Sequence, residues 1–283
     1  PSPWTRRNGM SALEILSGEG RALQHQDKVA LITGAGRGIG LATARRFLAE
    51  GWQVALLDVD GETLKAAAAE LDQPDRTLAV TCDVADPDEV AAALDAVIQR
   101  FGRLDSLVNN AGIAVFKPML ETSFEDWQRS LAVNLGGPFL CTQKAAPIMA
   151  RTGGGSVVNI TSISGMRAST LRVAYGTSKA GLAHLTKQQA VELAGLGIRV
   201  NAVAPGPVDT AMAKAVHSPA IRADYHDTVP LNRYGLEEEI AEAIFFLCSE
   251  RASYITGQIL GVDGGFGATG IGLPTLRGNA RNS

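Results

Sequence analysis

Short apolar runs rich in β-branched residues alternate with longer Ala- and Leu-rich stretches from residue 28 onward. Most of the short runs are apolar throughout, which is typical of parallel strands that are covered on both faces. The predicted strands are residues 29–33, 53–58, 77–82, 106–109, 156–161, 199–204 and 259–262, and the predicted helices are 39–50, 61–71, 87–100, 124–151, 175–195 and 237–249. Repeated β-α-β units of this kind predict an α/β protein, a single-domain doubly wound Rossmann fold with a seven-stranded parallel sheet and helices on both faces.

The regular pattern covers residues 27–266, which we expect to form one folded domain. Residues 1–26 have no clear periodicity and predict an N-terminal arm, whereas residues 267–283 are rich in Gly, Arg and Asn and predict a fraying C-terminal tail. Residues 206–235 lack strand signals. Because ligands bind beyond the carboxyl ends of the strands in this fold, we interpret that segment as a substrate lid, with an ordinary surface insertion as the alternative.

Composition narrows the classes of partner. The chain has 283 residues, 46% of them hydrophobic, which is enough for a sizeable core. The formal net charge is −3 and no basic run occurs, so we expect no nucleic-acid partner. No apolar run approaches the roughly 18 residues of a membrane span, so we expect no membrane partner. The three cysteines follow no disulfide or metal-ligand pattern, so we expect no metal site. We expect the cysteines to be small buried thiols in a reducing compartment, and the protein to be cytoplasmic.

A glycine-rich turn follows the first predicted strand, where residues 29–40 read VALITGAGRGIG. Gly34, Gly38 and Gly40 allow a tight turn and a close approach of the backbone to a pyrophosphate. The helix that starts here offers free N–H groups and the positive end of its dipole to the same anion. A glycine turn without a ligand is the alternative, but the preceding strand and the following helix favour dinucleotide binding.

The second predicted strand ends in a carboxylate, Asp58, 18 residues after Gly40. A carboxylate there can accept hydrogen bonds from both adenosine ribose hydroxyls and repels a 2′-phosphate, so it indicates NAD rather than NADP. Arg37 points the other way, because a cation in the glycine turn could meet a 2′-phosphate. We favour NAD, because a misplaced carboxylate repels the phosphate directly. Asp83, after the third strand, could reach the adenine amino group or simply begin a helix.

Tyr175 and Lys179 lie four residues apart in a predicted helix and therefore share one face. A free tyrosine has a pKa of about 10 and is a poor base near neutrality. An adjacent ammonium favours the phenolate, so we expect Lys179 to lower the pKa of Tyr175. Tyr175 could then exchange a proton with an alcohol or a carbonyl while hydride moves to or from nicotinamide, and Ser162 could orient the same oxygen. Taken alone, the pair could also be an ordinary surface Tyr and Lys.

Several motifs in order resemble the short-chain dehydrogenase/reductase family, in its compact single-domain branch, from about residue 28 to 266. The matching segments are TGAGRGIG at 33–40, NNAG at 109–112, Asn134 in VNL, Ser162 thirteen residues before the YxxxK of Tyr175 and Lys179, Pro205-Gly206 with Thr210, YITGQ at 254–258 and DGG at 263–265. The departures are the arm of about 26 residues and the tail after Phe266.

The resemblance implies roles for individual residues and places an NAD(P)-binding catalytic domain at 27–266. It implies that Asn134 kinks a helix and holds a relay water, that Lys179 also holds the nicotinamide ribose, and that the Val208 N–H and the Thr210 hydroxyl grip the carboxamide. The expected catalytic residues are Asn134, Ser162, Tyr175 and Lys179. The expected cofactor-binding residues are Gly34, Arg37, Gly38, Ile39, Gly40, Asp58, Asp83, Val84, Asn110, Ala111, Gly112, Tyr175, Lys179, Pro205, Gly206, Val208 and Thr210. The family commonly forms tetramers, so a homotetramer or homodimer is expected.

The resulting hypothesis is an NAD-dependent oxidoreductase that interconverts a secondary alcohol and a ketone, with a small-molecule substrate. An NADPH-dependent carbonyl or 3-oxoacyl-carrier-protein reductase is one alternative, and a non-enzymatic NAD-binding regulator is another. The substrate itself is not specified by the sequence. Candidate pocket residues are Ser164, Met166, Arg167, Arg172, Val208, Met212, His217, Tyr225 and His226. Arg167 and Arg172 could meet an anionic substrate or could be solvated surface arginines.

Overall fold

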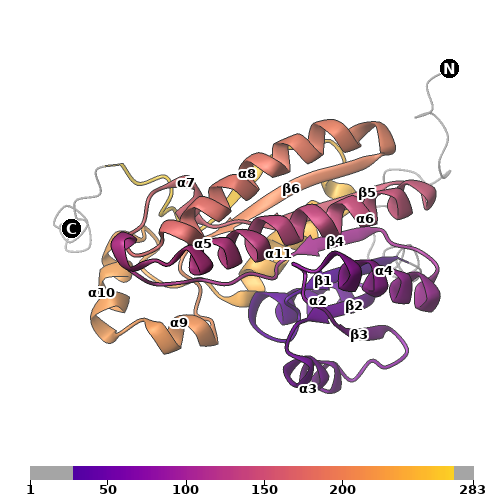
Figure 1. Ribbon diagram of the computed structural model, residues 1–283, viewed down its shortest axis with the longest axis horizontal. Coiled ribbons are helices and arrows are strands. Elements are labelled where there is room, and N and C mark those ends of the chain that lie inside the picture. Colours follow the sequence, from indigo (N-terminus) through magenta and orange to yellow (C-terminus); the bar gives the residue numbers. More distant parts are fainter. Residues whose placement is uncertain (1–27, 271–283) are drawn as a thin grey trace, which may run out of the picture.

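A seven-stranded parallel sheet organises the molecule (Figure 1). The computed structural model describes residues 28–270, apart from the side chains at positions 212 and 215. The strands are β1 (Val29–Thr33), β2 (Gln53–Asp58), β3 (Thr77–Thr81), β4 (Ser106–Asn109), β5 (Gly155–Ile160), β6 (Ile198–Pro205) and β7 (Ile259–Val262). Their order across the sheet is β3-β2-β1-β4-β5-β6-β7, and every neighbouring pair is parallel. The prediction of a doubly wound Rossmann fold is therefore confirmed.

Each predicted helical stretch is helical in the structure, one of them with an interruption. The helices between strands are α2 (Gly38–Ala49), α3 (Gly61–Leu71), α4 (Pro87–Phe101), α5 (Phe124–Leu131), α6 (Gly137–Arg151), α7 (Ile163–Met166), α8 (Val173–Leu193), α9 (Ala211–Val216), α10 (Pro219–Thr228) and α11 (Glu237–Cys248). The short helices α7, α9 and α10 occur in addition to the predicted stretches. Short 3₁₀ turns are η1 (Met119–Glu121), η3 (Ala194–Leu196) and η4 (Glu250–Ala252). The helix expected over 124–151 is split, because a π-helical turn, η2 (Ala132–Gly136), separates α5 from α6.

Local sequence explains where several helices begin. The Asp86 carboxylate accepts hydrogen bonds from the N–H groups of Asp88 and Glu89, and Pro87 occupies the first turn of α4. The Asp60 carboxylate caps α3 through the Thr63 N–H. These caps satisfy N–H groups that have no partner within the helix, so each helix starts at a defined residue.

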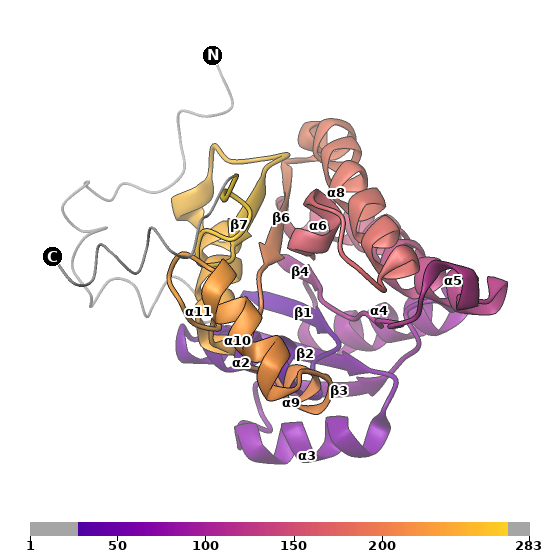
Figure 2. The same ribbon diagram turned by 90° about the vertical axis from the view of Figure 1, so that its left-hand side faces the viewer.

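Each face of the sheet packs on its own set of helices (Figure 2). Alternate residues of β1 point to opposite faces: Ile32 packs with side chains from α2, α3 and α11, whereas Leu31 packs with side chains from α4, α6 and α8. On the first face, Phe47, Trp52 and Phe245 form an edge-to-face cluster with ring centroids 5.0–6.3 Å apart. The three cysteines are free and buried, as predicted.

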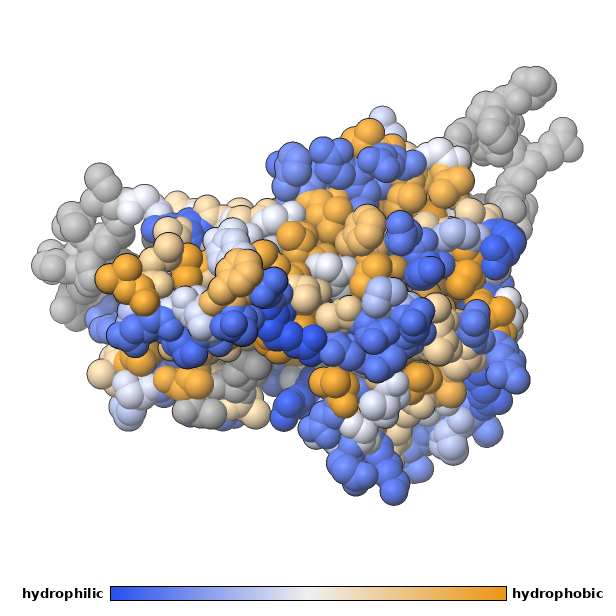
Figure 3. All heavy atoms as spheres, viewed as in Figure 1, coloured by the Kyte–Doolittle hydropathy of each residue, from blue (hydrophilic) through white to orange (hydrophobic). Residues whose placement is uncertain are grey.

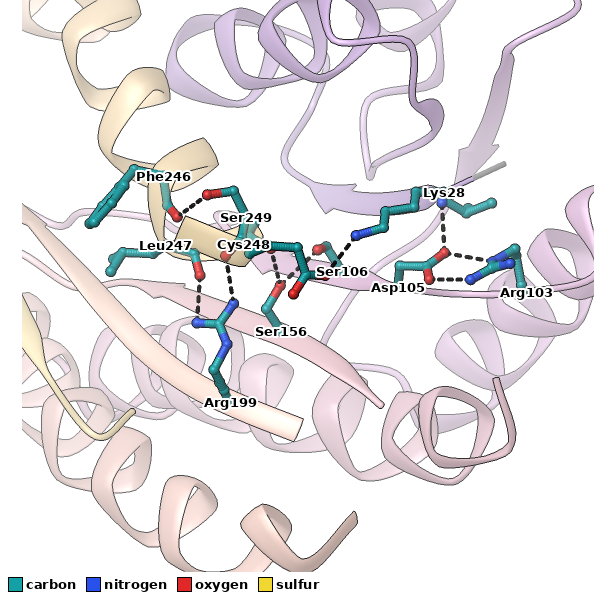
Figure 4. Close-up of polar contacts among 12 residues, drawn as sticks. Lys28, Arg103, Asp105, Ser106, Ser156, Arg199, Phe246, Leu247, Cys248 and Ser249 are labelled. Carbon is teal, nitrogen blue, oxygen red and sulfur yellow. Dashed lines mark hydrogen bonds and ion pairs between the residues drawn. The ribbon is translucent and has the colours of Figure 1, made fainter. Parts of the chain in front are cut away.

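Polar side chains close the amino ends of the central strands (Figure 4). The hydroxyls of Ser106 and Ser156 are hydrogen-bonded at 2.8 Å, and Ser156 also donates to the Cys248 carbonyl at 3.2 Å. Arg199 donates to the carbonyls of Leu247 and Ser249 at 2.8 and 3.1 Å, at the end of α11. This end of the sheet is therefore occupied by contacts that join the strands to α11.

The opposite end of the sheet is where a ligand can be held. The chain reverses its direction of winding between β1 and β4, and the carboxyl ends of these two strands meet there. The segment predicted as a lid contains α9 and α10, which lie at this end (Figure 2). No helix within residues 28–270 is long and apolar enough to cross a membrane. The predicted arm at 1–26 and the tail beyond residue 270 lie outside the described residues.

Candidate active site

The glycine turn after β1 has the geometry that close backbone packing requires. Gly34 and Gly38 have φ of +64° and +61°, a region that disfavours side chains. A Cβ on Gly40 would lie 2.1 Å from the Gly34 carbonyl oxygen, so only glycine fits. The side-chain amide of Asn110 donates to the carbonyls of Thr33 and Gly34 at 2.9 and 3.0 Å and fixes the turn.

The N-terminus of α2 carries no side-chain cap. Its N-cap residue, Arg37, makes no capping hydrogen bond and its side chain is exposed. In contrast, α3 and α4 are capped by the carboxylates of Asp60 and Asp86. The first N–H groups of α2, at Gly38, Ile39 and Gly40, thus meet no capping side chain within the described residues. A phosphate fits this position, because it supplies the missing acceptors and meets the positive end of the dipole.

The Asp58 carboxylate is fixed against the glycine turn. Its Oδ2 accepts a hydrogen bond from the Gly36 N–H at 3.0 Å, and its Oδ1 accepts one from the Asp60 N–H at 3.1 Å. Each carboxylate oxygen has a further lone pair available. The two bonds therefore orient a negative charge at the end of β2 and leave it able to accept hydrogen bonds from a diol.

Asp83 and Val84 follow β3, where the sequence suggested an adenine contact. The Asp83 carboxylate accepts hydrogen bonds from the Arg129 guanidinium at 2.7 Å and from the Ala85 N–H at 3.0 Å. Burial alone would raise the pKa of Asp83, but these two donors outweigh it, so its pKa is lowered. Val84 is buried, and a Cβ on Gly137 would lie 2.7 Å from its Cγ2, so this segment packs tightly onto α6.

Tyr175 and Ser162 meet above the carboxyl end of β5. Ser162 is the N-cap of α7 and is hydrogen-bonded to Tyr175, which lies in the first turn of α8. Burial is the largest influence on Tyr175 and raises its pKa, while the Ser162 hydrogen bond and the Arg172 charge act against burial. Lys179 is not among the lowering influences, so the expectation that it depresses the pKa of Tyr175 is wrong for this structure.

The position of the Lys179 ammonium explains this difference. Its Nζ donates to the Ile160 carbonyl at 2.7 Å and lies 5.8 Å from the centroid of the Tyr175 ring. The side chain is only 3% exposed, and burial lowers the pKa of Lys179 to about 8. Burial therefore disfavours the charged form of both side chains, the ammonium of Lys179 and the phenolate of Tyr175.

Asn134 occupies the π-helical turn η2 and joins it to the loop after β4. Its Oδ1 accepts a hydrogen bond from the Ile113 N–H at 2.8 Å, and its Nδ2 donates to the Ile113 carbonyl at 2.9 Å and to Ser178 Oγ at 3.0 Å. A Cβ on Gly112 would lie 3.2 Å from Asn134 Oδ1 and 3.3 Å from Lys179 Nζ. The two catalytic candidates thus border the same small space, which glycine keeps open.

The NNAG segment also holds the site together from within. Asn109 is buried and donates to Asn159 Oδ1 at 2.8 Å, linking β4 to β5. The hypothetical Cβ of Gly34 would lie 2.8 Å from the Ala111 Cα, so these two backbones are in close contact. The amide of Asn110, predicted to bind cofactor, is used for the glycine turn described above. Asn110 therefore supports the cofactor candidates through the backbone it positions.

The segment after β6 presents an N–H group that no described residue accepts from. The Gly235 N–H donates to the Pro207 carbonyl, and the Gly235 carbonyl accepts from the Asp209 N–H, both at 2.9 Å. These two hydrogen bonds fix the residues on either side of Val208. Within residues 28–270 its own N–H has no acceptor, although Val208 is buried. Nearby, the Gly206 N–H donates to the Val262 carbonyl at 3.1 Å, anchoring Pro205-Gly206 to β7. Thr210 Oγ1 accepts from the Ala213 N–H at 3.1 Å and keeps its hydroxyl proton free to donate. These donors fit an amide carbonyl.

A cavity of about 400 Å³ lies between the loop before α8 and the lid helices. Of the predicted pocket residues, Arg172, His217 and Tyr225 line it. Arg167 instead donates to the Phe266 carbonyl at 2.7 Å, and the His226 ring lies 5.7 Å from that of Tyr234. The side chain of Met212 lies outside the described atoms. The sequence analysis missed the lining residues Phe116, Ser169, Thr170, Leu171 and Ile221, which come from irregular segments or carry no distinguishing motif.

Among residues 28–270, no three His, Cys, Asp or Glu side chains come together in a way that could hold a metal ion. The polar side chains gathered at the carboxyl end of the sheet include Tyr175, Ser162, Lys179 and Asn134.

Comparison with known proteins identifies the family. Residues 34–267 match a family model described as enoyl-(acyl carrier protein) reductase. The chain is 41% identical to a 3-oxoacyl-[acyl-carrier-protein] reductase of Thermotoga maritima over 85% of this chain and 98% of that protein. It is 43% identical to a cis-4-hydroxycyclohexanecarboxylate dehydrogenase of Sinomonas cyclohexanicum over 86% of this chain and 97% of that protein. A solved short-chain type dehydrogenase/reductase from Mycobacterium ulcerans superposes with a TM-score of 0.83 at 34% identity, over 86% of this chain and 91% of that one.

The chain belongs to the short-chain dehydrogenase/reductase family. The family resemblance stated from sequence is thereby confirmed, and the protein is an oxidoreductase of a family that binds a nicotinamide cofactor. In short-chain dehydrogenase/reductase terms, the structure brings the Ser and YxxxK positions, Ser162, Tyr175 and Lys179, together with Asn134 at one end of the sheet. The individual roles of these residues remain predictions.

Proposed function

We propose that this short-chain dehydrogenase/reductase uses NAD to interconvert a secondary alcohol and the corresponding ketone by hydride transfer. The observation that carries the choice of cofactor is the Asp58 carboxylate, held by the N–H groups of Gly36 and Asp60. A fixed negative charge at this place accepts hydrogen bonds from the two ribose hydroxyls and repels a 2′-phosphate. When bound, the nicotinamide supplies the acceptor or donor of the hydride.

The chain offers a fitting contact for each part of NAD. The uncapped N-terminus of α2 would hold the pyrophosphate, and Asp58 the adenosine ribose. The free N–H of Val208 and the hydroxyl of Thr210 would hold the carboxamide. Lys179 would hold the nicotinamide ribose. Asp83 and Val84 would line the adenine. Asn110 and Ala111 support the glycine turn, and Gly112 would bind cofactor beside Lys179.

In the proposed reaction, Tyr175 gives a proton to the carbonyl oxygen during reduction and takes it back from the hydroxyl during oxidation. Ser162, already hydrogen-bonded to Tyr175, donates to the same substrate oxygen and orients it. A raised pKa keeps Tyr175 protonated and suits it to donate a proton. Oxidation needs the phenolate, which the Arg172 charge and the Ser162 hydrogen bond would favour. Asn134, beside the Lys179 ammonium, would hold the water that relays protons to solvent.

A second candidate is an NADPH-dependent carbonyl or 3-oxoacyl-carrier-protein reductase. Two observations support it. The relative from Thermotoga maritima carries the name 3-oxoacyl-[acyl-carrier-protein] reductase. The exposed Arg37 sits at the start of α2, where a cation could meet a 2′-phosphate. We place this candidate second because no hydrogen bond holds the Arg37 side chain in place among the described residues, whereas two hold the Asp58 carboxylate.

The deciding experiment follows the absorbance of reduced nicotinamide in both directions. NAD(H) and NADP(H) are compared over secondary alcohols, diols, sugars, hydroxysteroids and oxoacyl esters. We expect turnover with NAD(H) that Tyr175→Phe abolishes. Asp58→Asn should shift the ratio of kcat/KM toward NADP by at least about tenfold, since one fixed charge acts over a few ångströms. The matched control, Asp60→Asn, loses a charge two residues away and should leave the ratio unchanged.

Other outcomes discriminate between the candidates. A wild-type preference for NADPH with oxoacyl esters would favour the second candidate. Tight NADH binding without turnover of any substrate would favour a non-enzymatic NAD-binding regulator. A Tyr175→Phe variant as active as the wild type would contradict the role given to Tyr175.

The proposal extends to organisation and location. We propose that residues 27–266 form the catalytic domain, with residues 206–235 as its substrate lid, in a cytoplasmic enzyme. We also propose a homotetramer or homodimer, because apolar residues gather along α6 and α8 on one face (Figure 3), and Phe139 and Val191 are 46% and 79% exposed. Sedimentation and cell fractionation test these two points.

A further inference from the structure

The cavity between the loop before α8 and the lid helices combines apolar walls with a single full charge. Phe116, Leu171, Val216 and Ile221 contribute apolar surface. Arg172 is the only Arg, Lys, Asp or Glu among the described residues that line it. A cavity of about 400 Å³ has room for a small organic molecule. Its lining therefore suits a compact apolar body that carries one group complementary to a guanidinium.

Arg172 has no anionic partner among residues 28–270. Its Nη1 donates to Ser164 Oγ at 3.3 Å and its Nη2 donates to the Tyr225 hydroxyl at 3.4 Å, both long bonds to neutral oxygens. Its guanidinium also stacks on Phe116, with Cζ 5.0 Å from the ring centroid. No carboxylate within residues 28–270 lies within ion-pair distance of it. A half-buried guanidinium has lost part of its hydration and gains from an anionic partner.

The neighbouring arginine shows the contrast. Arg222, on the lid helix α10, pairs with Asp209 at 2.8 Å and stacks on Tyr234 at 4.2 Å. Lys214 also reaches Asp209, at 3.4 Å. Asp209 is thus already shared by two cations outside the cavity lining, and it does not pair with Arg172.

The place of Arg172 in the chain fixes where that group would sit. It lies three residues before Tyr175, as the N-cap of α8, and its charge is felt at the Tyr175 hydroxyl. A substrate with its reacting oxygen at Tyr175 and Ser162 would therefore extend a short distance to reach the guanidinium. A guanidinium pairs in a planar, bidentate way with a carboxylate or a phosphate, and of these two groups we take the carboxylate.

We infer that the substrate is a small oxo acid or hydroxy acid whose carboxylate pairs with Arg172, while its apolar body fills the cavity and its reacting oxygen lies at Tyr175. This inference rests on the proposed oxidoreductase function and adds the substrate class. It does not depend on whether NAD or NADP is the cofactor. The proposed substrate is a free acid and not an ester or thioester, because the group that pairs with Arg172 is the carboxylate itself.

The test compares oxo acids with their own amides, which match them in size and lack the charge. Pairs such as 4-oxocyclohexanecarboxylate and 4-oxocyclohexanecarboxamide, and open-chain pairs of several lengths, are assayed with whichever nicotinamide supports turnover. We expect the best acid to exceed its amide in kcat/KM by at least about tenfold, corresponding to about 1.4 kcal/mol. Arg172→Gln should raise KM for the acid and remove this preference, and Arg172→Lys should restore part of it.

The ratio of acid to amide isolates binding from chemistry. Loss of the Arg172 charge also alters Tyr175, but that effect is common to both members of a pair and cancels in the ratio. Arg167→Gln is the control, because Arg167 contacts Phe266 outside the cavity lining and should leave the ratio unchanged. Equal rates for acids and amides in the wild type, or an acid preference that survives in Arg172→Gln, would overturn the inference.

A binding measurement covers the case in which no pair is turned over. Calorimetric titration of the protein, loaded with reduced cofactor, with cyclohexanecarboxylate and cyclohexanecarboxamide reports the same subsite without catalysis. Tighter binding of the acid that Arg172→Gln abolishes supports the inference even if the proposed reaction fails. No preference for the acid in this titration refutes the carboxylate subsite, even if NAD-dependent turnover of neutral ketones is found.

Discussion

Replacing Lys179 should make the folded protein more stable at neutral pH while it removes activity. The ammonium is only 3% exposed, and burial lowers its pKa from 10.5 to about 8. Between these two pH values the unfolded chain holds a proton that the folded protein has released. The free energy of unfolding therefore rises with pH across this window, and the burden of the buried charge is fully present below pH 8.

The magnitude follows from the size of the shift. A pKa lowered from 10.5 to about 8 corresponds to about 3 kcal/mol at pH 7, at about 1.4 kcal/mol per pKa unit. Lys179→Met removes the charge and keeps most of the volume. It also takes a donor from the Ile160 carbonyl, which costs about 1–2 kcal/mol. We expect the variant to be more stable than the wild type by about 1–2 kcal/mol at pH 7.

Urea unfolding at pH 7 and pH 10 measures this effect. The advantage of Lys179→Met should fall by about 2–3 kcal/mol between the two pH values, because the wild type sheds the buried charge. Protein concentration is kept constant, since self-association would shift apparent stability. The control is Lys187→Met, which removes an exposed lysine from the same helix and should show little change at either pH. A Lys179→Met protein that is less stable than the wild type by the same amount at both pH values would refute the reasoning.

Two further predictions concern the two ends of the sheet. Gly40→Ala places a Cβ 2.1 Å from the Gly34 carbonyl oxygen, so calorimetry should show at least tenfold weaker dinucleotide binding, while Gly195→Ala, with no atom within 4 Å, should bind normally. Arg199→Met removes donors from three backbone carbonyls near the end of α11, so urea unfolding should show a loss of about 2–4 kcal/mol, and the folded fraction should bind cofactor as the wild type does.

The sheet could be predicted from sequence because its signal is local and repeated. Four strands, including β1 and β2, begin and end at the predicted residues, whereas β3 differs by one residue at one end and β5 and β6 differ by one residue at both ends. Continuous apolar runs mark strands buried on both faces, and the caps at Asp60 and Asp86 mark helix starts within the chain itself. The proximity of Tyr175 and Lys179 was predictable for the same reason, since helical spacing alone places them on one face.

Features that depend on distant contacts were not predictable. The π-helical turn at Ala132–Gly136 interrupts a pattern that indicates one continuous helix, and the Asn134 amide there is bound to Ile113, 21 residues earlier. The effect of Lys179 on Tyr175 was misjudged because spacing does not give the direction of the ammonium, which turns to the Ile160 carbonyl. The cavity is lined by residues that are distant in the sequence, such as Phe116 and Ile221, and no periodicity relates those positions.

Buried polar groups have different roles at the amino and carboxyl ends of the strands. At the amino ends, the polar side chains are hydrogen-bonded to other parts of the protein and so stabilise the fold. These side chains are Ser106, Ser156 and Arg199. At the carboxyl ends, the Lys179 ammonium donates one of its three possible hydrogen bonds to the Ile160 carbonyl. The Val208 N–H has no acceptor among the described residues. Such groups lower stability in the protein alone and become favourable when a ligand meets them. Cofactor should therefore raise the unfolding temperature of the wild type more than that of Lys179→Met, because the variant has already lost one of the charges that the ligand would satisfy.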